Sequence, residues 1–156
     1  MANQYVRYFL CFFLFNISIV LCASKECTGN PDINIQLQTA VSFTKTQEFN
    51  NLFEVIRLSR QWEEYANNIE NTFSINIEKI VRSANPNDTL KTFKRKVLRT
   101  IPFDVKIRFL LARRSFNIEK IAVLYANLYT LPEVQMIINE LCSMNVNIND
   151  IAAALL

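Results

Sequence analysis

The chain has 156 residues and a formal net charge of +3, and its content of 51% hydrophobic and 20% charged residues is typical of one folded domain. It contains no histidine, which excludes catalytic triads with an imidazole base and zinc sites with a histidine ligand. The single glycine, Gly29, excludes glycine-rich phosphate loops and argues against hairpin-rich β architectures.

Residues 1–23 are typical of a secretory signal peptide. Arg7 gives a positive start, an apolar run covers residues 8–20, and Ala23 offers a small residue at the cleavage site. An uncleaved membrane anchor is the alternative, but polar residues interrupt the run, and a spanning helix needs ~20 apolar residues. We therefore expect cleavage and a secreted, extracellular protein with a single helical domain over residues 24–156.

The exported chain has two predicted sites of covalent modification. Of the four cysteines, Cys27 and Cys142 remain after cleavage, and two such thiols in an oxidising compartment are predicted to form a disulfide. Two unpaired thiols are the alternative. Asn87-Asp88-Thr89 matches the N-glycosylation acceptor in a loop-like stretch, which makes Asn87 a candidate glycosylation site.

Helical periodicity predicts four helices in the first half of the mature chain. Two are expected over residues 33–43 and 47–58, a third begins after Ser59, and a short fourth begins after Ser74. Thr46, Ser59 and Ser74 are the expected N-terminal caps, because a hydroxyl oxygen accepts a hydrogen bond from a free backbone N–H of the first turn.

The second half begins with a strongly basic helix over residues 89–101. Pro102 restarts a helix, Ser115 caps the next one, and Thr130-Leu131-Pro132-Glu133 predicts a capping box for the helix that follows. A last short helix closes the chain. No segment alternates with a period of two, so we expect an all-α fold, a compact bundle or shell of six to seven short amphipathic helices.

The two halves of the mature chain resemble each other. Residues 75–80 and 146–151 each have a β-branched residue, then Asn, then Ile, and a second Ile three positions later, at an offset of 71 residues. This similarity predicts a degenerate internal duplication of residues 30–84 and 89–156. Chance similarity between two pairs of amphipathic helices is the alternative.

Several short segments form a wider pattern: Asn30-Pro31-Asp32-Ile33, Gln47-Glu48-Phe49, Ile101-Pro102-Phe103-Asp104, Arg114-Ser115-Phe116, Thr130-Leu131-Pro132-Glu133-Val134-Gln135 and Asn145-Val146-Asn147-Ile148. In this pattern the chain resembles the insect allergen-related repeat family, the microvillar proteins that include the major cockroach allergen. It departs from the family in its shorter unit, in its basic helix and in the asparagines of its last segment, where family members usually have glycine and aspartate.

The resemblance implies a non-enzymatic shell of helices around an apolar cavity that carries fatty acid or phospholipid. The inward stripes of both halves would line it: Phe49, Phe53, Ile56, Phe109, Phe116, Ile121, Leu128, Ile138 and Leu141. Arg108, Arg113 or Arg114 would meet the lipid headgroup at the mouth. A solid core is the alternative. We expect no catalytic residue, metal or cofactor.

The basic segment, residues 89–114, has nine basic residues and one acid, Asp104. An amphipathic basic helix is typical of a membrane-surface element, so an anionic membrane is the second predicted partner. The candidate contacts are Lys91, Lys94, Arg95, Lys96, Arg99, Arg108, Arg113 and Arg114. A solvated outer face is the alternative, and export argues against nucleic acid as a partner. A membrane-active or toxin-like protein, or a solid-core interaction protein, that acts through residues 89–101 is therefore the alternative function.

Overall fold

The computed structural model describes residues 27–105, 107 and 118–155. These residues form eight helices: α2 (Ile33–Thr44), α3 (Gln47–Arg57), α4 (Arg60–Phe73), α5 (Ile77–Ser83), α6 (Leu90–Thr100), α8 (Ile118–Tyr129), α9 (Pro132–Ser143) and α10 (Ile148–Leu155). Residues 103–105 are also helical, and no described residue lies in a strand. The all-α prediction is confirmed, with slightly more helices than expected.

Two of the predicted caps are confirmed, and the structure adds a third that was not predicted. The side chain of Thr46 accepts a hydrogen bond from the backbone N–H of Phe49, and the side chain of Ser59 accepts one from the N–H of Trp62. The side chain of Thr89 caps α6 in the same way. Each hydroxyl satisfies a backbone donor that has no partner inside its helix, which fixes where α3, α4 and α6 begin.

The predicted cap at Ser74 is wrong. Ser74 ends α4 instead: its backbone N–H donates to the carbonyl of Glu70 at 2.8 Å, and its φ of 56° places it in the left-handed region. Asn76 caps α5, because its amide oxygen accepts a hydrogen bond from the N–H of Lys79 at 2.9 Å. The α5 helix begins at Ile77, so the residue directly before it is Asn76, and the cap lies two positions later than predicted.

The predicted capping box before α9 is also wrong. The hydroxyl of Thr130 donates to the carbonyl of Asn127 at 2.6 Å, so it satisfies the end of α8 rather than the start of α9. Leu131 occupies the cap position of α9 without a side-chain hydrogen bond, and Pro132 stands in the first turn. Proline has no N–H to satisfy there, which lowers the need for a cap.

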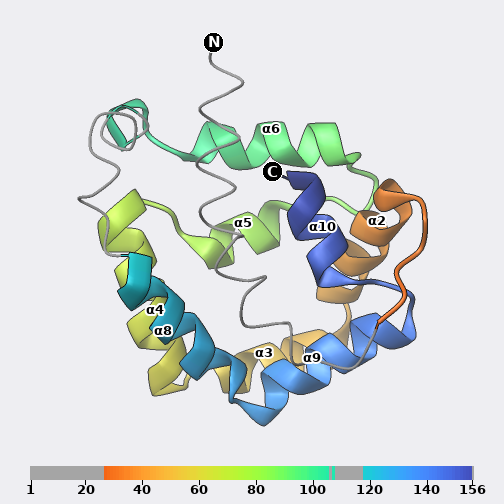
Figure 1. The fold of residues 1–156 in the computed structure, drawn as a ribbon, viewed down its shortest axis with the longest axis horizontal. Helices are drawn as coiled ribbons and strands as arrows, with labels where there is room; N and C mark the ends of the chain where they lie inside the picture. Colours follow the sequence, from red (N-terminus) through yellow and green to blue (C-terminus); the bar gives the residue numbers. More distant parts are fainter. Residues whose placement is uncertain (1–26, 106, 108–117, 156) are drawn as a thin grey trace.

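The helices pack as pairs that form a ring (Figure 1). The α4 helix lies against α8, α3 lies against α9, and α10 packs on α2, while α6 runs along the top of the view. The largest buried apolar cluster joins Ile56, Tyr65 and Ile69 to Ile121 and Leu128, so both halves of the chain share one core.

The structure gives the two halves matching geometry. At the predicted offset of 71 residues, Ser74 and Asn145 are the non-glycine residues with positive φ in the described chain, 56° and 58°. Each precedes a buried β-branched residue, and α5 and α10 then begin at Ile77 and Ile148, which are also 71 residues apart. The α3 helix packs on α9 and α4 packs on α8, so each of these two contacts joins one helix of the first half to one helix of the second. The internal duplication itself stays a prediction.

The segment before α2 is attached to the end of the chain. Cys27 and Cys142 form a disulfide with 5.6 Å between their Cα atoms. The amide of the buried Gln36 donates to the carbonyl of Asn30 at 2.6 Å and to the carboxylate of Asp150 at 3.0 Å. Its oxygen accepts from the N–H of Asn147 at 2.9 Å. The disulfide and these hydrogen bonds join the first described residues to the α9–α10 turn.

Candidate functional site

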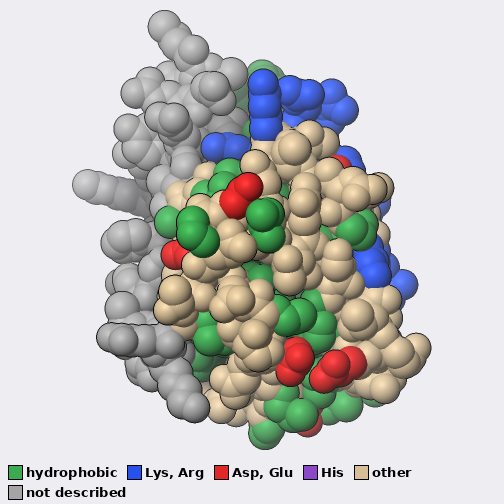
Figure 2. All heavy atoms as spheres, turned by 90° about the vertical axis from the view of Figure 1, so that its right-hand side faces the viewer, with side chains coloured by type: hydrophobic (Ala, Val, Ile, Leu, Met, Phe, Trp, Pro, Cys, Tyr) green, Lys and Arg blue, Asp and Glu red, His purple; other side chains and the backbone are tan. Residues whose placement is uncertain are grey.

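The α6 helix has an apolar side and a basic side. Leu90 and Phe93 pack against the buried cluster around Leu37 and Val41, and Leu98 packs against the main core. Lys91, Arg95 and Arg99 are spaced four residues apart and are exposed, so they form one outward stripe, the basic face of α6. Figure 2 shows Lys and Arg side chains gathered at the top of the molecule, at the level of this helix.

Most of the basic side chains of α6 have no acidic partner among the described residues. Within the described part of the chain, Lys91, Lys94, Arg95 and Arg99 have no ion-pair partner. Lys94 is half-buried at the edge of the stripe. Lys96 differs from the other candidates, because its ammonium contacts both oxygens of the Asp88 carboxylate at 2.7 and 3.0 Å. Lys96 is thus part of the fold, whereas the other four side chains have no ion-pair partner among the described residues.

An exposed aromatic residue follows α6 closely in the sequence. Phe103 is 76% exposed and stands three residues after the end of α6, in a helical turn at the same end of the molecule (Figure 1). Phe103 is not among the site residues predicted from the sequence, since it belongs to no helical stripe and a proline precedes it. An exposed phenyl ring and exposed basic side chains are the residue types that membrane-surface contacts use.

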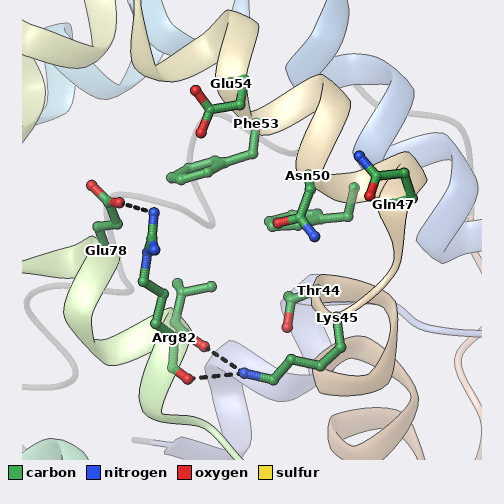
Figure 3. Close-up of a pocket in the computed structure, with 10 residues that line it drawn as sticks. Thr44, Lys45, Gln47, Asn50, Phe53, Glu54, Glu78 and Arg82 are labelled. Carbon is green, nitrogen blue, oxygen red and sulfur yellow. Dashed lines mark hydrogen bonds and ion pairs between the residues drawn. The ribbon is translucent and has the colours of Figure 1, made fainter.

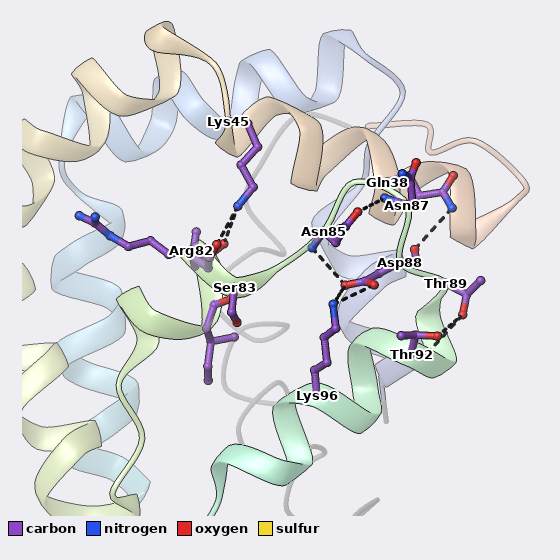
Figure 4. A network of polar contacts seen from close by, with 12 residues as sticks. Gln38, Lys45, Arg82, Ser83, Asn85, Asn87, Asp88, Thr89, Thr92 and Lys96 are labelled. Atoms are coloured by element: carbon purple, nitrogen blue, oxygen red, sulfur yellow. Dashed lines mark hydrogen bonds and ion pairs between the residues drawn. The ribbon is translucent and has the colours of Figure 1, made fainter.

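The loop before α6 is fixed by the buried carboxylate of Asp88 (Figure 4). This carboxylate accepts hydrogen bonds from Lys96 and from the backbone N–H of Asn85 at 3.1 Å, and the hydrogen bond from Lys96 is the main reason that the pKa of Asp88 is lowered. Asn87 is exposed at the tip of this loop, and its backbone N–H donates to the side chain of Asn85 at 2.9 Å. Its glycosylation stays a prediction.

The predicted cavity-lining residues lie in several places. Ile56, Ile121 and Leu128 belong to the main core, whereas Phe49 and Leu141 belong to a second buried cluster with Phe43 and Val146. Ile138 borders a small pocket of about 20 Å³ beside the disulfide. Phe109, Phe116, Arg108, Arg113, Arg114 and the predicted cap Ser115 lie outside the described residues, so the cavity stays a prediction.

Six aromatic rings form a continuous row that passes through the second buried cluster and the main core. Successive ring centroids lie 5.3 to 6.4 Å apart along Phe43, Phe49, Phe53, Trp62, Tyr65 and Tyr125. The row runs from α2 through α3 and α4 to α8 and so connects the two halves. Burial raises the pKa of Tyr125 to about 12 and also raises the pKa of Tyr65, so both phenols stay protonated at neutral pH.

A cleft opens where this row reaches the surface. It has a volume of about 440 Å³, and it lies between α3, α5 and the turn that joins α2 to α3 (Figure 3). Phe49 and Phe53 line it, as do Lys45, Val81 and Arg82. Two of the predicted lipid contacts therefore border an accessible space.

Other kinds of site find no support in the described residues. No group of three acidic, cysteine or histidine side chains among them is arranged to hold a metal ion. None of the described helices is long and apolar enough to cross a membrane. Comparisons of the chain with protein-family models, curated proteins and solved structures gave no match. Membership of the insect allergen-related repeat family therefore stays a prediction.

Proposed function

We propose that this protein is exported and acts at anionic lipid surfaces, which it contacts through the basic face of α6. The observation that carries the proposal is the exposed stripe of Lys91, Arg95 and Arg99, which has no ion-pair partner in the described chain. Each basic residue near an anionic membrane contributes about 1 kcal/mol, and unpaired side chains contribute it without breaking an internal contact. The exposed ring of Phe103 would add apolar contact with the interface.

A vesicle-binding experiment tests this proposal. Mature protein is mixed with vesicles that contain phosphatidylserine, and the bound fraction is measured by co-sedimentation at increasing salt. Replacing Lys91, Arg95 and Arg99 by glutamine should weaken binding about a hundredfold, since three contributions of ~1 kcal/mol are lost. Wild-type binding should also fall steeply with salt, because exposed charges are screened.

A matched control removes the same charge from other surfaces. Arg57, Arg60 and Lys79 lie on α3, α4 and α5, are exposed, and are replaced by glutamine in one variant. Arg57 and Arg60 pair with Glu54 and Glu64, so this variant changes the net charge equally but removes cations that already have acidic partners. This control should keep most of the vesicle binding. Equal losses in the two triple variants would mean that net charge alone governs binding, and that result would contradict a specific basic face.

Lipid carriage is the second candidate, and one observation favours it. Ile56 from the first half and Ile121 and Leu128 from the second half share a buried cluster, so the predicted inward stripes of both halves converge. An acyl chain enclosed there would gain about 0.8 kcal/mol per buried methylene. Organic extraction of protein purified from a eukaryotic host should yield stoichiometric fatty acid or phospholipid, and a lipid-free extract would remove this candidate.

A further inference from the structure

The cleft between α3 and α5 has a rigid apolar floor. The rings of Phe49 and Phe53 are stacked, with 5.5 Å between their centroids and 10° between their planes. Phe53 also makes an edge-to-face contact with Trp62, with 5.3 Å between the ring centroids and 82° between the ring planes. Figure 3 shows the Phe53 ring pointing into the space between the two helices. An apolar group that enters the cleft therefore meets a surface that is already formed.

Among the described charged groups around the cleft, one cation has no carboxylate partner. Glu54 pairs with Arg57 and Glu78 pairs with Arg82, so these four charges cancel. Lys45 has no carboxylate partner in the described chain. Its ammonium donates to two backbone carbonyls at the end of α5, that of Arg82 at 2.9 Å and that of Val81 at 3.5 Å.

The position of Lys45 makes this cation accessible to a ligand. An ammonium group has three protons, and the two carbonyls use two of them. Carbonyl oxygens hold the side chain in place without neutralising its charge. Figure 3 shows Lys45 crossing the opposite end of the cleft from Phe53, so a positive point and an aromatic surface face one space of about 440 Å³. That volume falls within the range of small-molecule sites, roughly 300–1,000 Å³.

We propose that this cleft binds a small molecule that has an apolar, preferably aromatic, body and one anionic group. The body packs on Phe53 and Phe49, and the anionic group accepts the third proton of the Lys45 ammonium. This site is separate from the basic face of α6, and the inference does not depend on membrane binding.

The test uses the fluorescent aromatic sulfonate 8-anilinonaphthalene-1-sulfonate as the probe. Its affinity for the mature protein is measured by fluorescence titration, with the uncharged N-phenyl-1-naphthylamine as a second probe of the same body. Lys45→Met keeps the aliphatic stem but removes the charge, so it should weaken the sulfonate about tenfold or more and leave the uncharged probe unchanged. Phe53→Leu should weaken both probes, and thermal melts confirm that each variant is folded.

Two control variants keep the result specific. Lys79→Met removes an exposed cation from another position of α5 and should change neither affinity. The α6 triple glutamine variant should also bind the sulfonate like the wild type, which separates this site from the basic face. An unchanged sulfonate affinity in Lys45→Met, or a loss confined to the α6 variant, would overturn the proposal.

Discussion

At the scale of single residues, the only glycine of the chain stands where a side chain does not fit. A Cβ atom on Gly29 would collide with the carboxylate of Asp150 and the amide of Gln36. These two groups bond to each other at 3.0 Å, and Gln36 is 2% exposed. Glycine is therefore needed at position 29 because neighbouring atoms approach the backbone closely. Its backbone angle is not the reason, since its φ is not positive.

This geometry predicts the effect of Gly29→Ala. The added methyl group should separate Gln36 from Asp150 and leave the buried amide short of a partner, at a cost of about 1–3 kcal/mol in the free energy of unfolding. Urea denaturation followed by circular dichroism measures the change. Thr28→Ala alters the exposed neighbouring residue and should stay within about 0.5 kcal/mol. A Gly29→Ala variant as stable as wild type would show that the segment before α2 moves away freely.

The lowered pKa of Asp88 makes stability depend on pH in a defined direction. Its carboxylate is stabilised in the folded state by Lys96 and by the N–H of Asn85, so folding favours the ionised form. This contribution is fully present above the unfolded-state pKa of ~3.9 and is lost as the pH falls through the lower folded-state value.

Asp88→Asn should therefore destabilise the protein at pH 7 by about 1 kcal/mol, because the carboxylate is buried but the Lys96 side chain is 41% exposed and its charge is partly screened. The difference from wild type should shrink when unfolding is measured at pH 3 and below. Glu70→Gln, on the exposed side of α4, is the matched control and should change the free energy of unfolding at pH 7 by less than about 0.5 kcal/mol. A destabilisation that is the same at pH 7 and pH 2 would contradict the ionic origin.

At the scale of elements, the sequence predicted helices better than the junctions between them. The periodicity of α2 and α3 placed both helices within one residue of their ends, because apolar spacing is a property of the whole segment. Ser74 and Thr130 were misassigned, because a hydroxyl at a short junction can serve either helix. The choice depends on the local backbone, as the φ of 56° at Ser74 shows, and spacing carries no information on that angle.

The same limit applied to the candidate sites. The basic stripe of α6 follows from residue spacing, whereas the contact of Lys96 with Asp88 depends on how the loop before α6 folds back. The α3–α5 cleft was not predictable, since Lys45 and Arg82 are 37 residues apart and meet only through packing. Loop and packing geometry therefore had to come from the structure.

The left-handed backbone of Ser74 predicts that glycine stabilises the protein there, whereas glycine at the helical Ser83 destabilises it. Glycine adopts positive φ without steric cost, so Ser74→Gly should raise the free energy of unfolding by roughly 0.5–1 kcal/mol. Ser83→Gly, at the end of α5 in a helical conformation, should lower it by up to about 1 kcal/mol. Thermal or urea unfolding measures both. If both variants lose stability, the strain assigned to Ser74 is incorrect.

At the scale of the whole molecule, the disulfide connects parts of the fold that are 115 residues apart. Cys27 precedes the first described helix, and Cys142 lies in α9, so the bridge closes a loop over nearly all of the described chain. A cross-link across so long a loop restricts the unfolded chain strongly, and the entropy model gives a limit of about 4–5 kcal/mol. Hydrogen bonds from Asn147 to the carbonyl of Cys27 and from Asn30 to the carbonyl of Asn145 hold the same junction.

Because the junction has these additional contacts, removal of the disulfide should weaken the fold without releasing the segment before α2. In the mature, air-oxidised protein, alkylation followed by intact mass measurement should detect no free thiol before reduction and two after it. The Cys27→Ser, Cys142→Ser double variant should keep its helical circular dichroism spectrum and unfold at lower urea, with a loss of up to about 4–5 kcal/mol. Replacing Ser143 by alanine next to the bridge is the control, because its exposed hydroxyl contacts only the Glu140 carbonyl among the described residues. Two thiols that react in the native protein before reduction would contradict both the bridge and its stabilising role.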